Sequence, residues 1–208
     1  MKDLNQEAIK LPMPQQIEAL HHKYAPSAAA FDLVFTHCNI VSEIAAQCIA
    51  DKRLTVDDEL VKVGCLLHDI GVYPLLDKSG KEREGIHYIT HGIRGEAILR
   101  EEGFPETICR FASHHTGVGL TKQDIVSQKL PLPLQDYEAE TKEEELIMYA
   151  DKFHSKLIPP CFNTYEYYKK SVAKFGQDKA ERFEQMAQEF GVPDLAPFIE
   201  KYGHAVRG

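Results

Sequence analysis

Ten histidines stand in this chain of 208 residues, and several of them lie among apolar residues, where an unpartnered imidazole is costly. His68 and Asp69 follow directly on the apolar run CLL at residues 65–67. Imidazole and carboxylate groups that are buried together are typical metal ligands, because a bound ion turns their burial from a cost into coordination. The sequence therefore suggests a buried metal centre.

Helical spacing directs further polar residues towards the same interior. His37 lies four residues before Val41 and seven before Ile44, and His115 follows Phe111 by four, so both histidines fall on apolar stripes. Similar spacing applies to His91 and Asp151. Of the adjacent pair 114–115, only the second lies on the stripe, so we favour it as the ligand. The predicted metal ligands are His37, His68, Asp69, His91, His115 and Asp151, with His114 as an alternative or additional ligand.

Helical periodicity dominates the rest of the chain, which predicts an all-α fold of roughly seven to nine helices. Residues 28–52 read as one long helix, and Asp57–Asp58 offer caps for a helix that we expect to end at Gly71. The Gly- and Pro-containing segments 72–89 and 116–141 are predicted loops. We expect a single domain over residues 1–208, with the motifs at about 30–155 and a C-terminal helical extension at about 160–208.

The order His37, His68–Asp69, His91, His114–His115 and Asp151 resembles the HD-domain superfamily of metal-dependent phosphohydrolases. The spelling HDIG at residues 68–71 matches its HDIG-type branch, and the resemblance covers about residues 30–155. It implies an HD-domain-like helical bundle with a metal centre in its core. In that pattern His37, His68, Asp69 and Asp151 hold a first ion, while His91 and a histidine at 114/115 hold a second ion, bridged by Asp69.

The resemblance also implies the cofactors and the chemistry. Two divalent ions are expected, with iron or manganese preferred and zinc or magnesium as alternatives. The implied function is hydrolysis of a small phosphate ester or anhydride, nucleotide-like or dinucleotide-like, by a metal-activated water, with Asp69 and His114 as catalytic residues. Two alternatives stay open. One is a mixed-valent di-iron oxygenase of the same fold that acts on a small polar substrate. The other is a non-catalytic regulatory or binding module whose fold is stabilised by a bound metal ion.

A phosphorylated small-molecule substrate needs cations beyond the metals. Arg94 is the favoured candidate, because it lies one turn after His91 on the same predicted helix. Val72 stands where some family members have a lysine after the HDIG glycine, which puts a mechanism through that lysine in doubt. The candidate substrate-binding residues are Arg94, Lys78, Lys81, Arg83 and Lys122.

The bulk composition limits the class of partner and the location. With 24 basic and 32 acidic residues the formal charge is −8, which argues against a nucleic-acid polymer or an anionic membrane as partner. No run approaches the roughly 20 apolar residues of a membrane span, and MKDLNQEAIKLPMPQQ lacks the apolar core of a signal peptide. Five cysteines form no CxxC pair. We expect a cytoplasmic protein with reduced thiols, and a homodimer is an open alternative.

The remaining histidines are expected to have less specific roles. His21, His22, His87 and His204 lie in polar or terminal stretches, which predicts surface positions. His154 follows Asp151 by three residues, which makes it a candidate for orienting that carboxylate by a hydrogen bond.

Overall fold

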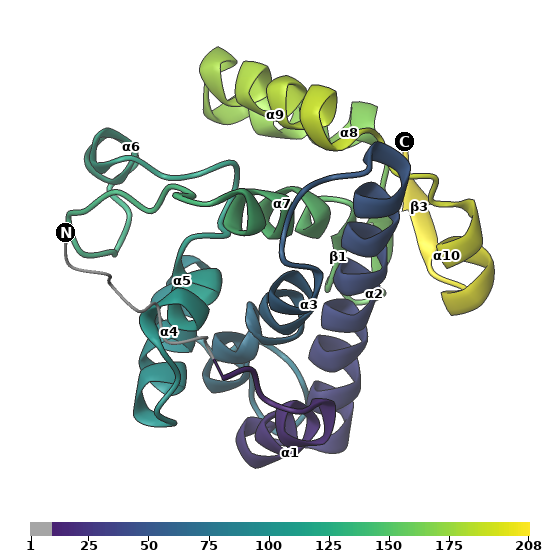
Figure 1. The fold of residues 1–208 in the computed structure, drawn as a ribbon. Helices are drawn as coiled ribbons and strands as arrows, with labels where there is room; N and C mark the ends of the chain where they lie inside the picture. The colour runs from purple at the N-terminus through teal and green to yellow at the C-terminus, as the bar shows by residue number, and fades with distance from the viewer. Residues whose placement is uncertain (1–9) are drawn as a thin grey trace, which may run out of the picture.

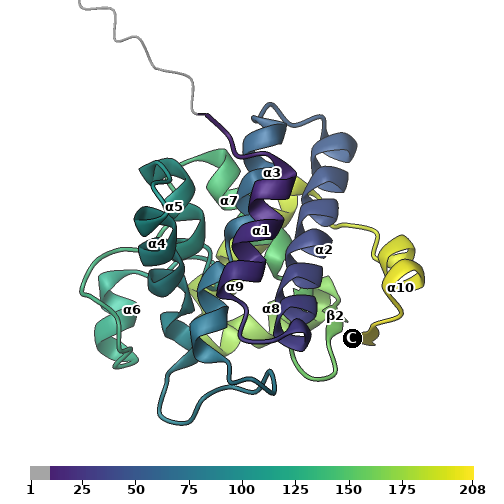
Figure 2. The same ribbon diagram turned by 90° about the horizontal axis from the view of Figure 1, so that it is seen from below.

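The computed structural model describes residues 10–208. The prediction that the N-terminal stretch is not a signal peptide concerns in part residues 1–9, which lie outside the described residues. The described chain is mainly helical, with three short 3₁₀ helices and one small sheet (Figure 1, Figure 2). The prediction of a mainly helical fold is confirmed. The α-helices are α1 (Pro14–Tyr24), α2 (Ala28–Lys52), α3 (Asp58–Leu67), α4 (His91–Glu101), α5 (Glu106–Ser113), α6 (Lys122–Ser127), α7 (Lys142–Asp151), α8 (Tyr165–Val172), α9 (Gln177–Phe190) and α10 (Ala196–Tyr202).

The elements that the sequence pattern did not predict are a short helix and three short strands. Helix α6 has six residues and lies inside the segment 116–141 that was predicted as a loop. The strands have two or three residues each, too few for an alternating pattern to register. The remaining elements are η1 (Ile70–Leu75), η2 (Tyr88–Thr90), η3 (Ala173–Phe175), β1 (His154–Ser155), β2 (Cys161–Asn163) and β3 (Ala205–Arg207).

Helix α2 has the predicted bounds, and side-chain caps start it and the next helix. The Ser27 hydroxyl accepts from the backbone N–H of Ala30, and the Asp57 carboxylate accepts from that of Leu60. By length and composition α2 is apolar enough to cross a membrane, with a mean hydropathy of 1.3 over 18 residues. Packing accounts for this character, because its predicted stripe, including His37, is buried in the core.

The helices pack around a central group formed by α2, α3 and α7. Helices α4 and α5 lie side by side on one flank, and α10 lies on the other side of α2 (Figure 1, Figure 2). Helix α9 packs on α7 through aromatic rings, since Tyr149 lies 5.4 Å from Phe183 and 5.6 Å from Phe190 between ring centroids. This C-terminal packing fixes the end of α7, where Asp151 lies.

The small sheet holds the C-terminal tail against the same region. Strand β2 pairs antiparallel with β1 and parallel with β3, with Phe162 opposite both His154 and Val206. The backbone N–H of Thr164 donates to the carbonyl of Arg207. The last residues of the chain are therefore anchored next to the residues that follow α7.

Gly71 has a different role from the predicted one. Helix α3 ends at Leu67, and Gly71 lies inside η1 without a positive φ. A Cβ atom there would lie 2.1 Å from the carbonyl oxygen of His91 and 2.2 Å from the backbone nitrogen of Gly95. Gly71 therefore permits the close packing of η1 on the start of α4.

His21 is buried, so the prediction of a surface position for this residue is wrong. Its Nδ1 atom accepts from the Tyr73 hydroxyl at 2.7 Å, and its Nε2–H donates to the carbonyl of Leu66 at 2.7 Å. Burial lowers the pKa of His21 to about 4. A neutral ring with both nitrogens paired explains how this histidine is tolerated in the core. His22 and His87 are exposed, as predicted.

Gly71→Ala is expected to destabilise the fold by about 1–3 kcal/mol, because the added methyl meets backbone atoms that cannot rotate away. Urea unfolding measures the change. Gly208→Ala is the control, since its Cβ would lie 3.9 Å from its nearest neighbour, and it should unfold like the wild type. Equal stability of Gly71→Ala and the wild type would contradict the packing role.

His21 is expected to make stability depend on pH between 6.5 and 4. Its folded pKa lies below its unfolded value, so the unfolded state binds more protons in this window and stability falls as pH falls. From pH 7.5 to 5.0 the wild type should lose about 2 kcal/mol more unfolding free energy than His21→Gln. His22→Gln, at an exposed site, should retain the wild-type slope. Identical slopes for both variants would contradict the assignment.

Candidate metal centre

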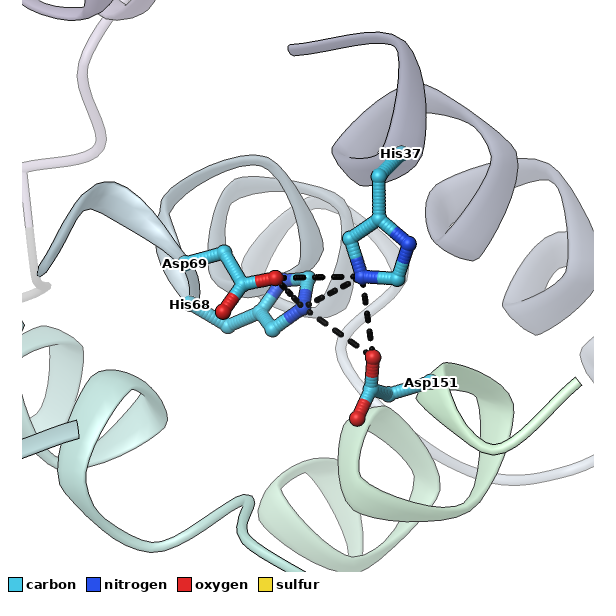
Figure 3. Close-up of side chains that lie close together, drawn as sticks. All are labelled: His37, His68, Asp69 and Asp151. Atoms are coloured by element: carbon cyan, nitrogen blue, oxygen red, sulfur yellow. Dashed lines mark hydrogen bonds and ion pairs between the residues drawn. The ribbon is translucent and has the colours of Figure 1, made fainter. Parts of the chain in front are cut away.

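The six predicted ligands come together in the core. His37 lies in the middle of α2, His68 and Asp69 follow α3, and Asp151 is the last residue of α7 (Figure 3). His91 is the first residue of α4, and His115 follows α5. Five helices thus converge on one place, although their ligands are spread over 115 positions of the sequence.

Four of these residues form a first group. Nε2 of His37 lies 3.1 Å from Oδ2 of Asp69 and 2.9 Å from Oδ1 of Asp151. Nε2 of His68 lies 3.3 Å and 3.5 Å from the same two oxygens, as the dashed lines of Figure 3 indicate in part. Four ligand atoms at such separations surround a space of the size that one ion occupies at metal–ligand distances of about 2 Å.

The second group uses the other oxygen of Asp69. Oδ1 lies 3.7 Å from Nε2 of His91 and 3.6 Å from Nε2 of His115, and the two imidazole nitrogens lie 2.9 Å apart. Asp69 thus belongs to both groups, one oxygen to each. Of the pair 114–115, the structure brings His115 to this group, while Nδ1 of His114 lies 2.7 Å from the Ser113 hydroxyl instead.

Backbone carbonyls orient three of the four imidazoles. Nδ1 of His68 donates to Cys65, that of His91 to Tyr88 and that of His115 to Phe111, at 2.7–3.1 Å. A carbonyl only accepts, so each Nδ1 carries a hydrogen, and Nε2 is the ring atom that faces the centre and would bind an ion there. Burial lowers the pKa of His91 and holds that of His115 well below its usual value, so these rings are neutral.

The carboxylate of Asp69 is fully buried, and no hydrogen-bond donor is aligned with either oxygen. Burial alone would raise its pKa, but Lys156 and His68 hold the pKa of Asp69 well below its usual range. A buried, ionised carboxylate without aligned donors is expensive unless a cation satisfies it. With the neighbouring imidazoles and Asp151, and without thiolate, these groups fit a divalent ion such as iron, manganese or zinc.

A pocket of about 600 Å³ reaches Asp151 from the surface. Its wall combines apolar side chains, two tyrosines and polar groups. It is lined by Leu33 of α2, Val72, Leu76, Gly80, Lys81, Glu82, Tyr88, the segment 151–152, the segment 154–158, Asn163 and Tyr168. A small molecule in this pocket would therefore meet one edge of the ligand cluster.

Two lysines at this edge were not predicted. The Lys156 ammonium is in ion-pair contact with Oδ2 of Asp69, and its side chain is only 12% exposed. The Lys152 ammonium donates to Oδ2 of Asp151 at 2.7 Å and to the carbonyl of His115 at 2.9 Å. Neither residue belongs to a periodic pattern, and their short distance in sequence from Asp151 was the available signal.

Of the five predicted substrate cations, the structure brings one to the pocket. Lys81 lines it, whereas Arg94 is exposed and its Nε donates to the Thr90 hydroxyl. Arg83 donates Nε to the carbonyl of Leu76, and Lys122 pairs with Asp136 on the surface. Lys78 is exposed. Arg94 follows His91 by three residues, but its side chain is exposed instead of lining the pocket.

His114 and His154 also differ from expectation. His114, predicted as a catalytic residue, lies outside both ligand groups, with its ring 5.6 Å from that of Tyr137. His154 contacts His37 instead of Asp151. His204, predicted at the surface, is half-buried against His154.

The family comparison agrees with this geometry. The sequence model of the HD domain matches residues 34–156, which include all six ligands. The chain belongs to the HD domain family. The predicted resemblance is therefore confirmed.

Curated relatives and solved structures extend the comparison. An uncharacterized protein of Methanocaldococcus jannaschii is 42% identical over 121 residues, 57% of this chain and 64% of that protein. The tRNA (cytidine(56)-2'-O)-methyltransferases of Picrophilus torridus and Thermoplasma volcanium are 36% and 35% identical, over 62% and 68% of this chain but only 33% and 36% of theirs. This chain thus spans less than two thirds of the length of these relatives.

Among solved structures, the HD domain of the L. monocytogenes phosphodiesterase PgpH, in complex with cyclic-di-AMP, shares the fold of this HD domain protein. The TM-score is 0.50 at 20% identity, over 86% of this chain and 88% of that chain. A second structure of the same PgpH domain gives a TM-score of 0.50 at 19% identity. At this identity the similarity concerns the fold alone.

Proposed function

We propose that this HD domain protein is a metal-dependent phosphohydrolase that cleaves a small phosphate ester or anhydride. The observation that carries the proposal is a lysine-bearing pocket that reaches Asp151, at one edge of two ligand groups joined by Asp69. Metal ligands beside a cationic pocket suit a substrate with phosphoryl oxygens, which need neutralisation from both sides.

The six ligands would hold two divalent ions, preferably iron or manganese. His37, His68 and Asp151 with one oxygen of Asp69 would hold the first, and His91 and His115 with its other oxygen the second. When bound, such ions lower the pKa of a water molecule and neutralise negative charge on phosphorus-bound oxygens. The carbonyl-bound Nδ1 atoms keep the imidazoles in the orientation that this requires.

Lys156 and Lys81 would supply the protein's own positive charge to the substrate. Lys156 lies between the pocket and Asp69, and its pKa is raised by Asp69 against the effect of burial, so the ammonium stays charged. Val72, in the position where some family members have a lysine, lines the same pocket. Lys156 therefore offers a cation from a different part of the chain.

The pocket suits a substrate of nucleotide or dinucleotide size. Its volume of about 600 Å³ lies within the usual range of small-molecule sites. Tyr88 and Tyr168 with Leu76 offer flat and apolar surface for a group such as a base. The net charge of −8 still argues against a nucleic-acid polymer. A single domain, a cytoplasmic location and a homodimer stay predictions.

The proposal is tested by loading purified protein with Mn²⁺, Fe²⁺ or Zn²⁺ and assaying a panel of nucleotides, cyclic dinucleotides and other phosphate esters. Lys156→Met should lower kcat/KM about 100-fold, because a preorganised cation beside the phosphoryl group is lost. Lys62→Met, at an exposed position of α3 outside the pocket, should retain the wild-type value.

Two results would overturn the hydrolase. One is a metal-loaded protein that hydrolyses no phosphate ester or anhydride bond in any panel member. The other is a mixed-valent Fe(II)/Fe(III) signal in electron paramagnetic resonance together with O₂ consumption, which would support the oxygenase alternative.

The two-ion arrangement makes a separate prediction about metal content. The wild type should bind about two Mn²⁺ per chain, and His91→Ala about one, because the variant removes one imidazole from the second group only. Elemental analysis after desalting measures this content. His114→Ala should retain both ions, since His114 lies outside both groups. Loss of an ion in His114→Ala but not in His91→Ala would reverse the assignment.

A further inference from the structure

His37 differs from the other histidine ligands in the partner of its Nδ1 atom. The other three rings donate to backbone carbonyls, whereas Nδ1 of His37 lies 2.9 Å from Nδ1 of His154. Nε2 of His154 in turn lies 2.9 Å from Nδ1 of His204. Three imidazoles thus form a row that runs from the ligand cluster to the half-buried His204 near the end of the chain.

With an ion on Nε2 of His37, the row would admit one direction of hydrogen bonding. Nε2 of His37 faces the carboxylates of Asp69 and Asp151 and must be unprotonated to serve as a ligand, so its Nδ1 carries the hydrogen. Nδ1 of His154 then accepts, its Nε2–H donates, and Nδ1 of His204 accepts. Each ring in the row sets the position of the proton on the next.

The sheet builds this row. Adjacent rings lie side by side, with centroids 5.2 Å apart and planes inclined by 30° for His37 and His154, and 5.1 Å and 26° for His154 and His204. Phe162 of β2 packs against both His154 and His204, at 5.0 Å and 5.9 Å. His204 directly precedes β3, whose pairing with β2 holds the tail in place.

We propose that His154 and His204 are positioning residues that fix the proton and the ring orientation of His37, so that the C-terminal tail completes the metal centre. This inference rests on the metal-binding part of the proposed function and does not depend on hydrolysis. It assigns the tail a chemical role in addition to its packing.

The test uses the full chain with His204→Asn and His204→Leu. The asparagine Oδ1 can replace the accepting Nδ1 of the imidazole, whereas leucine has similar bulk and no acceptor. Calorimetric titration of the metal-free proteins with Mn²⁺ should show binding about 10-fold weaker for His204→Leu and close to wild type for His204→Asn. His154→Leu, which removes the direct partner of His37, should weaken binding at least as much.

A second readout detects the protons directly. In the Zn²⁺-loaded wild type, ¹⁵N resonances of the imidazoles should show the hydrogen on Nδ1 of His37 and on Nε2 of His154. In His204→Leu, the hydrogen should stay on Nε2 of His154, because Nδ1 still accepts from His37, but the ¹⁵N resonance of this Nε2–H should shift, since it has lost its acceptor. Tail packing alone would leave these resonances unchanged.

Val206→Ala is the structural control. Val206 lies on β3, and its truncation loosens the tail without removing any member of the row. It should bind Mn²⁺ like the wild type. Two results would overturn the inference: unchanged affinity and unchanged ¹⁵N resonances of His154 in His204→Leu, or an equal loss of affinity in Val206→Ala. Failure of the wild type to bind any metal would refute both this inference and the proposed function, whereas metal binding without hydrolysis would refute the hydrolase alone.

Discussion

The buried carboxylate of Asp69 is the group on which the arrangement of this protein depends. It is ionised, and no aligned hydrogen bond satisfies its two oxygens. Such a group is tolerated only where positive charge is concentrated around it. The fold places the Lys156 ammonium against one oxygen and an imidazole pair beside each oxygen, from α2 and α3 on one side and from α4 and α5 on the other, where bound ions would supply further positive charge.

Helix ends explain why this convergence is compatible with a packed core. Five of the six ligands lie within two residues of a helix end, and the last carbonyls of a helix remain available to orient an imidazole. His68 and His115 use carbonyls in the last turns of α3 and α5 in this way. His37 lies in the middle of α2, where the carbonyls are engaged in the helix itself. It therefore needs a partner from elsewhere, and His154 fills that role.

The charge around the centre also shapes the pocket. Lys152 and Lys156 flank the two carboxylates and come from the segment after α7, which continues into the small sheet. The same segment lines the pocket that reaches the centre. The ligand Asp151, the two lysines and part of the pocket wall therefore all depend on the stretch of chain from the end of α7 to the residue after β1. This stretch is held in place by α9 and by the C-terminal strand β3. This arrangement links the C-terminal region to the chemistry in the core.

The sequence by itself determined the helical class, the bounds of α2 and the six residues that meet in the core. Long helices repeat every 3.6 residues, and histidines on an apolar stripe must point inwards. Only the tertiary structure decided the roles of Gly71, Lys156 and His204. Gly71 is required by the approach of another helix. Lys156 follows β1 and His204 precedes β3, and both strands are too short to leave a pattern in the sequence. Periodicity records which face of an element is buried, but not which distant element covers it.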